Sequence, residues 1–302
     1  MSDYAECLNI CDVGCSASGN KRSVPYAHLL NTIGAIQYEM NNLKASRKAY
    51  ETVYSIRLEL FGPKDLEVAT ILANIGNVES AEGNYDKAQD LFERAATIRE
   101  QHGEQEESEM LGLTCMQLGR VAALRGDHDQ AWKMYQKSEA YLLKKPGHNE
   151  TFFAHLLYAY GNLEYDSKRY KQALRIYEEC LTLCLKLWPL HHLTASTYYK
   201  LACVEFALRH PERALMLLDK SYNIAEARDP MELTGGKARI LRKKGEILSE
   251  DPIKHSDGLE LMQKMEDEHP KIAERQGLRI DPEDVRTASE EAFDLLVPGY
   301  FR

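Results

Sequence analysis

The sequence has little of what membrane and secreted proteins need. It contains no run of about 18 apolar residues, and its first residues lack a basic stretch followed by an apolar one. Its seven cysteines are an odd number without the spacing of a disulfide framework. We therefore predict no membrane partner and a cytoplasmic location, with the nucleus as the alternative.

Excess positive charge and catalytic motifs are also lacking. The chain has 38 Lys and Arg against 47 Asp and Glu, a formal net charge of -9, which argues against nucleic acid as a partner. We find no nucleophile–base–orienter set, no glycine-rich phosphate loop and no HExxH motif. We expect a protein that is not an enzyme and that needs no cofactor.

What the sequence does contain is an internal repeat. A small residue recurs at Gly34, Gly76, Gly119, Gly161 and Ala202, in steps of 42, 43, 42 and 41 residues. Twelve positions later comes a second small residue, and sixteen positions later a bulky one. Two antiparallel helices in close contact need such a set, because small residues let the backbones approach and the bulky side chain fills the space beside them.

The repeat defines the middle of the chain. We predict an array of about six helix pairs over residues 26–265, with a degenerate last unit around Gly245 and Gly258. A degenerate last unit is typical of a repeat that caps an array. Residues 270–302 form a separate segment, in which Asp281 as N-cap and Pro282 at the first helical position predict a capping helix and a tail.

The opening residues match only half of a repeat. Tyr4, Leu8 and Cys11 share one helical face, and they correspond to second-helix positions of a unit whose first helix is absent. We expect residues 1–18 to be that second helix. An apolar edge of this kind favours weak self-association through residues 1–16.

The repeat resembles a known family. A small residue, an alanine twelve positions on, an aromatic four positions later, and Gly83-Asn84-Tyr85 at the turn resemble the tetratricopeptide repeat (TPR). The 42-residue spacing is similar to that of kinesin-light-chain-like arrays, and the chain end resembles the C-terminal TPR arrays of fungal proteins. The resemblance implies an all-α fold, a right-handed superhelical solenoid of antiparallel helix pairs.

The resemblance also implies a function. TPR arrays are non-catalytic scaffolds or adaptors that bind a peptide or a partner domain in a concave groove. Two alternatives stay open: a regulatory or sensor array of a larger effector or nucleotide-binding protein, and a structural module that assembles homo-oligomers. The identity of the partner is not encoded in the repeat.

In this family the first helices of successive units line the groove. Asparagines there would pair with the backbone of a peptide, tyrosines would supply pockets, and Arg120 would meet an acidic group. Alternatively, the asparagines join neighbouring helices and the tyrosines cover the seams between repeats. The candidates are Asn31, Tyr38, Asn77, Arg120, His155, Tyr158, Asn162, Tyr165 and Tyr199.

One group of residues carries zinc-ligand types without a convincing site. Cys180 and Cys184 share a helical face, and His191-His192 follow the end of that helix. We expect core cysteines, surface histidines and no metal.

Basic residues gather near the end of the array. Residues 237–244 contain five of them, for which we expect a solvated helical face. Asn162, Lys200, Arg239 and Lys243 also give a partial likeness to a TPR subclass that grips C-terminal carboxylates, although Tyr158 stands where a lysine belongs.

Overall fold

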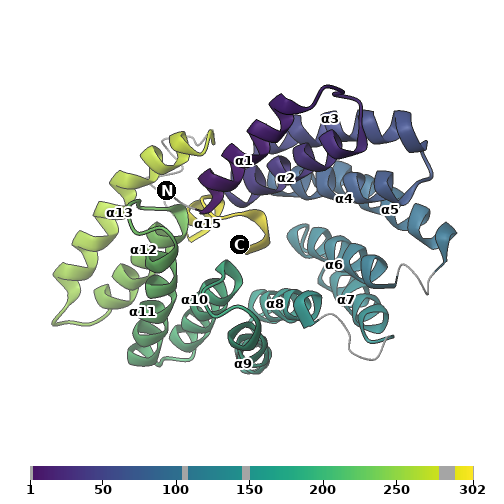
Figure 1. The fold of residues 1–302 in the computed structure, drawn as a ribbon. Coiled ribbons are helices and arrows are strands. Elements are labelled where there is room, and N and C mark those ends of the chain that lie inside the picture. Colours follow the sequence, from purple (N-terminus) through teal and green to yellow (C-terminus); the bar gives the residue numbers. More distant parts are fainter. Residues whose placement is uncertain (1–2, 104–107, 145–149, 279–289, 302) are drawn as a thin grey trace. The chain divides into compact units, whose positions relative to one another are not determined.

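The computed structural model describes residues 3–103, 108–144, 150–278 and 290–301, and helices dominate them (Figure 1). The described residues contain no β-strand, so the predicted all-α class is confirmed. In chain order the helices are α1 (Asp3–Ala17), α2 (Val24–Glu39), α3 (Leu43–Phe61), α4 (Leu66–Ala81), α5 (Tyr85–His102), α6 (Ser108–Leu124), α7 (His128–Leu142), α8 (Glu150–Asp166), α9 (Tyr170–Leu187), α10 (His192–Ala207), α11 (Pro211–Arg228), α12 (Gly235–Ser249), α13 (His255–Arg275), α15 (Glu290–Leu295) and the 3-10 turn η1 (Gly299–Phe301).

The chain divides into two compact units, Met1–Leu156 and Leu157–Arg302, with the boundary inside α8. In the first unit α2 packs on α3, α4 on α5 and α6 on α7. In the second unit α10 packs on α11, and α12 on α13. Turns of a few residues join the helices of each pair, so the two helices run antiparallel. The predicted array of helix pairs is therefore confirmed within each unit.

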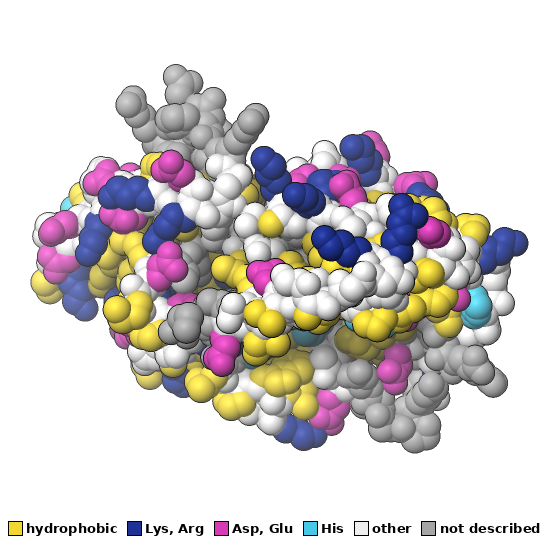
Figure 2. Space-filling model, turned by 45° about the horizontal axis from the view of Figure 1, so that its top comes forward, with side chains coloured by type: hydrophobic (Ala, Val, Ile, Leu, Met, Phe, Trp, Pro, Cys, Tyr) yellow, Lys and Arg dark blue, Asp and Glu magenta, His cyan; other side chains and the backbone are white. Residues whose placement is uncertain are grey.

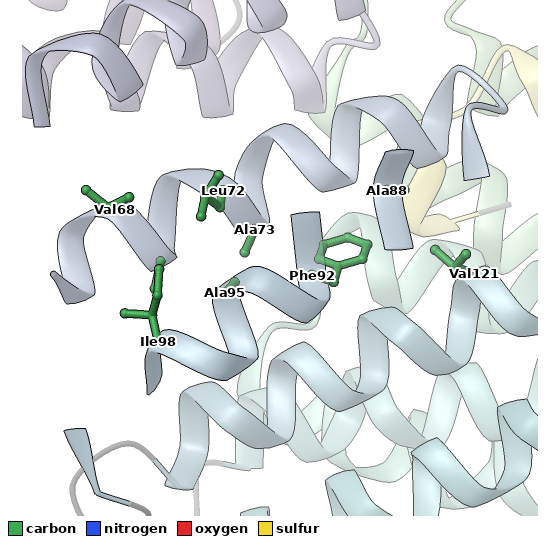
Figure 3. Close-up of a cluster of buried hydrophobic side chains, with 9 residues drawn as sticks. Val68, Leu72, Ala73, Ala88, Phe92, Ala95, Ile98 and Val121 are labelled. Atoms are coloured by element: carbon green, nitrogen blue, oxygen red, sulfur yellow. The ribbon is translucent and has the colours of Figure 1, made fainter. Parts of the chain in front are cut away.

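One close contact holds each pair together. A Cβ atom added to Gly76 of α4 would lie only 2.7 Å from Cε1 of Phe92 on α5. Phe92 is buried together with Ala88 and Ala95 (Figure 3). The aromatic ring thus occupies the space that a side chain at position 76 would need. The same contact joins Gly34 to Tyr50, Gly119 to Tyr135 and Gly161 to Tyr177.

The fifth helix pair shows that the small residue of the first helix and the bulky residue of the second helix vary together. Ala202 of α10 and Leu218 of α11 are both fully buried in one cluster with Ala214. Leucine replaces the aromatic ring here, and the first helix carries a methyl group in place of the glycine hydrogen. The pair of side chains, and not either residue alone, determines how closely the helices approach.

The turns inside the pairs use one backbone conformation. Asn41, Gly83, Gly126, Lys168 and Arg209 all have positive φ angles, between 58° and 83°. These five residues occupy equivalent positions in successive repeats. Glycine and asparagine adopt this conformation readily, whereas a lysine or an arginine there costs backbone energy that the packing of the pair must offset.

Helix α13 extends further along the chain than the sequence pattern predicts. Helix α13 continues through Pro270 to Arg275, ten residues beyond the expected end of the array at residue 265. His269 is buried, its Nε2 atom lies 3.0 Å from the carbonyl oxygen of Ala292, and its ring packs against Phe293 of α15 at 4.9 Å. The additional residues of α13 thus form part of the surface against which α15 packs. Asp281 and Pro282 lie outside the described residues.

The contact between Gly76 and Phe92 predicts a specific coupling. We expect Gly76→Ala to lower the free energy of unfolding by about 1–3 kcal/mol, because the new methyl group overlaps the ring. In a Phe92→Leu background the same change should be neutral or stabilising, since alanine favours a helix by about 1 kcal/mol over glycine. Urea unfolding of the four proteins of this double-mutant cycle measures the effect. Equal effects of Gly76→Ala in both backgrounds would contradict the proposed contact.

Helix α1 packs on α2, with Gly14 next to Leu29. On the predicted apolar face, Cys11 is buried and Leu8 is half-buried. Ile10 and Val13, which were not part of that face, are each 62% exposed. Much of the face that we expected to be open is therefore covered.

Self-association through residues 1–16 stays a prediction. Sedimentation velocity should show the native chain forming dimers at high concentration and Leu8→Asp shifting it towards monomer, because a charge at this position opposes apolar association. Asn9→Asp adds the same charge at an exposed position of α1 and serves as the control. A native chain that stays monomeric at every concentration would end this hypothesis.

Candidate functional site

In the first unit, amide side chains connect the first helices of successive pairs. Asn74 Nδ2 of α4 donates to Asn31 Oδ1 of α2 at 3.0 Å, and Gln117 Nε2 of α6 donates to Asn77 Oδ1 of α4 at 3.0 Å. Asn31 and Asn77 therefore join neighbouring helices, as the scaffold alternative predicts. No described residue accepts a hydrogen bond from the Nδ2 group of either asparagine. Both side chains are half-buried and not fully enclosed.

The other candidates of this unit differ in exposure. Tyr38 is buried and belongs to the interior, whereas Arg120 and His155 are half-buried. Burial lowers the pKa of His155, and the nearby Arg120 lowers it further, although the hydrogen bond to the Thr151 carbonyl opposes both. His155 is therefore neutral at pH 7, which leaves Arg120 as the cation of the two.

In the second unit, two candidates take part in the packing between helices. Asn162 Oδ1 accepts a hydrogen bond of 2.5 Å from Tyr177 Oη. The ring of Tyr158 lies 5.9 Å from the ring of Tyr177, and Tyr158 itself is 2% exposed. These contacts join α8 to α9 as well as orienting the side chains.

A segment from the end of the chain lies on the first helices of this unit. We call residues 290–301 the C-terminal segment. Its 3-10 turn η1 packs on α10, and α15 packs on α12 (Figure 1). The main-chain carbonyl of Phe301 accepts two hydrogen bonds, from Tyr158 Oη at 3.1 Å and from Arg239 Nη1 at 2.8 Å. The first helices α8 and α12 thus bind a polypeptide backbone, while η1 packs on α10.

The side chain of Phe301 is enclosed as well. It is 2% exposed, and its ring lies 6.4 Å from the ring of His191 and 5.8 Å from that of His192. We call the surface formed by Tyr158, His192, Tyr199, Lys200 and Arg239 the segment-binding face.

Two buried cations give this face its electrostatic character. Arg239 is 3% exposed, pairs with Asp294 Oδ1 at 2.9 Å, and lies 4.2 Å above the ring of Tyr199. Burial alone lowers the pKa of Lys200 and of Arg239, but the carboxylate of Asp294 and neighbouring tyrosine hydroxyls raise both pKa values above their ordinary level. Both side chains stay protonated. A buried cation without a counter-charge is costly, so Asp294 stabilises them.

The tyrosines complete the face. Burial raises the pKa of Tyr158 to about 12, so its hydroxyl remains protonated and donates to the segment. Tyr165 is half-buried, and Lys200 Nζ lies 5.7 Å from its ring centroid. Tyr199 is 1% exposed, and its ring packs against the guanidinium group of Arg239. Tyr158, Tyr165 and Tyr199 therefore gather around Lys200 and Arg239.

Lys200 and Arg239 were not among the predicted site residues. The sequence signal for them was the partial likeness to carboxylate-gripping arrays, which contains both. In the structure Arg239 pairs with the side-chain carboxylate of Asp294, which also raises the pKa of Lys200, whereas Lys243 pairs with Glu246 at 3.0 Å.

The expectation of a solvated face for residues 237–244 is wrong. Lys237, Arg239 and Lys243 are buried, because α12 is covered by α11, α13 and α15. All five basic residues have acidic partners: Glu226 for Lys237, Asp294 for Arg239, Glu246 for Arg242 and Lys243, and Asp219 for Lys244. On the face in Figure 2, basic side chains are interspersed with acidic and hydrophobic ones.

The Cys and His group is part of the packing. Cys180 and Cys184 are fully buried, as expected, but the histidines are not surface residues. His191 and His192 are half-buried, because Phe301 and Trp188 lie beside them. Within the described residues, no three His, Cys, Asp or Glu side chains gather in a metal-binding arrangement. None of the described helices is both long and apolar enough for a membrane span.

His192 makes the stability of the chain depend on pH. Its burial, with Arg228 and His191 nearby, lowers its pKa from 6.5 to about 3. Below about pH 6.5 the unfolded chain therefore takes up a proton that the folded chain does not, so stability falls as the pH falls. We expect a loss on the order of a few kcal/mol between pH 6.5 and pH 4.

Chemical denaturation at several pH values tests this dependence. His192→Gln should flatten the profile between pH 6.5 and pH 4, whereas His28→Gln, at an exposed position, should keep the native profile. An unchanged slope in His192→Gln would assign the acid sensitivity to other groups.

Comparisons with known proteins identify the repeat. The tetratricopeptide repeat model matches residues 26–101 and 152–227, which together make up half of the chain. A search of curated proteins found no match.

Solved structures share the fold at low sequence identity. The Rap conjugation gene regulator of the plasmid pLS20, in complex with the Phr* peptide, is 14% identical over 89% of this chain and 73% of that chain, with a TM-score of 0.65. The apo form of the quorum sensor NprR from B. thuringiensis is 16% identical over 97% and 82%, with a TM-score of 0.58. BtubC (BKLC) from P. vanneervenii is 15% identical over 78% and 95%, with a TM-score of 0.55. With its glycine–aromatic helix pairs and the matching family model, this chain belongs to the tetratricopeptide repeat family.

Proposed function

We propose that the chain is a non-catalytic scaffold or adaptor that binds a peptide, or an extended segment of a partner protein, on the first helices of its TPR array. One observation carries the proposal: the first helices of the second unit already hold a polypeptide backbone. The carbonyl of Phe301 accepts hydrogen bonds from Tyr158 and Arg239, two side chains of different first helices.

The chemistry of this surface suits peptide recognition. Hydrogen bonds to a main-chain carbonyl do not depend on the ligand's sequence, whereas a buried cation and an aromatic enclosure select its side chains. In the first unit, the Nδ2 groups of Asn31 and Asn77 are candidate donors to a bound backbone, and Arg120 is a candidate partner for an acidic group.

The fold is one that serves as a protein-interaction scaffold. The solved Rap regulator holds the Phr* peptide, so an array of this fold accommodates a peptide. We propose action by binding and not by catalysis, in the cytoplasm, with a protein or peptide as partner and without a cofactor.

Selection from a displayed random-peptide library on the immobilised chain tests the proposal. We expect the retained peptides to share a motif and to bind about tenfold more weakly to an Asn31→Asp, Asn77→Asp double variant. Aspartate keeps the oxygen that accepts from Asn74 and Gln117, but it removes the Nδ2 donor. The fold is therefore preserved while the proposed ligand contact is lost.

Charge is controlled by a second double variant. Gln101→Glu and Gln136→Glu add the same two negative charges at exposed positions of second helices, so this variant should bind like the native chain. A library without an enriched motif, or equal binding to both double variants, would contradict the proposal for the first unit.

A further inference from the structure

We propose that the segment-binding face of the second unit is a site for a partner segment that carries an acidic side chain and a phenylalanine, and that the chain's own C-terminal segment occupies this site until a partner displaces it. The inference rests on the proposed function, to which it adds the chemistry of the ligand and a means of regulation.

The requirement for an acidic side chain follows from the buried cations. Lys200 and Arg239 are both almost fully enclosed, and Arg239 pairs with Asp294 Oδ1 at 2.9 Å. The same carboxylate raises the pKa of both cations. A ligand that removes Asp294 without replacing its charge would leave two cations buried without a counter-charge, which is unfavourable. The face therefore selects ligands that carry a carboxylate.

The requirement for a phenylalanine follows from the enclosure of Phe301. Its ring is 2% exposed beside the rings of His191 and His192, and its carbonyl is held by Tyr158 and Arg239. Side chain and main chain are thus recognised together at one position. Such a combination of an anchoring side chain with backbone hydrogen bonds is typical of peptide-binding sites.

The C-terminal segment owes its position to docking. Helix α15 has six residues, too few to be stable as an isolated helix in water. Phe293 and Leu296 bury their side chains against Ala238, Met265 and Ile272. Asp294 and Phe301 instead contact the segment-binding face. Because the segment has little helical stability of its own, its position depends on its contacts with the rest of the unit, and a second ligand competes with it for the face.

One glycine tests whether a peptide with the sequence of the C-terminal segment docks where the segment itself does. The main chain of Leu296 passes so close to Gly235 that a Cβ atom there would overlap its carbonyl group. The adjacent Gly236 has only Thr234 Oγ1 near its Cβ position, at 3.9 Å. Both glycines lie at the start of α12 and neither has a positive φ angle. Gly235→Ala and Gly236→Ala are therefore a matched pair, of which only the first hinders the docking of Leu296, whether Leu296 belongs to the chain or to a peptide of the same sequence.

The experiment uses the full chain and a labelled synthetic peptide with the sequence of residues 290–302. Asp294→Asn and Phe301→Ala together weaken the contacts of the segment with the face while α12 is unchanged. Fluorescence anisotropy should show the unmodified peptide binding at least tenfold more tightly to this double-variant chain than to the native chain. The reason is that the native segment competes for the face at an effective concentration on the order of millimolar. Peptides with Asp294→Asn or Phe301→Ala should lose this binding, and a scrambled peptide should not bind.

The outcomes separate the two proposals. Equal affinity of the peptide for the native chain and for the chain with Asp294→Asn and Phe301→Ala, or equal binding of the scrambled peptide, overturns the inference. If library-selected peptides still bind the native chain, the proposed function stands without it. If neither the library-selected peptides nor the peptide of residues 290–302 binds, the proposed function and this inference are both contradicted.

Circular dichroism and the thermal midpoint establish that the variants are folded. In the chain with Asp294→Asn and Phe301→Ala, adding Gly235→Ala should weaken peptide binding at least tenfold, because the new Cβ atom overlaps Leu296 of the docked peptide, whereas adding Gly236→Ala should not. Equal peptide affinity of these two forms overturns the inference as well. If the form with Gly235→Ala does not fold, the comparison of the native chain with the double-variant chain decides.

Discussion

The close approach of two helices at one small residue is the constraint on which the rest of the structure depends. At Gly76 the ring of Phe92 occupies the place of a side chain, and the same contact recurs at Gly34, Gly119 and Gly161. This contact fixes which side of the first helix faces the second helix. The opposite side is thereby left for other partners, and it is on this side that the two units differ.

In the first unit the remaining side is joined by neutral hydrogen bonds. Asn31 and Asn77 accept from amides of the next first helix, so these two contacts join successive first helices without charge. In the second unit the corresponding helices carry Lys200 and Arg239, and Asp294 from the end of the chain pairs with Arg239. A surface with buried cations has to be covered by an anion, whereas an amide-lined surface does not.

Stability and binding therefore draw on the same contacts in the second unit. The hydrogen bonds from Tyr158 and Arg239 to Phe301 hold the C-terminal segment in place, and a foreign peptide would use the same donors. Because the C-terminal segment occupies the segment-binding face, a partner must bind this face more tightly in order to displace the segment. The proposed regulation would thus use the same residues as the proposed peptide binding.

The sequence by itself determined the helix pairs, because a pair is a local object whose small and bulky residues lie sixteen positions apart. Gly76, Phe92 and the turns at Asn41 and Gly83 could all be predicted from that spacing. Only the tertiary structure decided the surroundings of Tyr158, Lys200 and Arg239. The segment that covers them lies far away in the chain, and periodicity carries no information about such contacts. For the same reason the basic stretch at residues 237–244 is buried and paired although its pattern predicted a solvated helix.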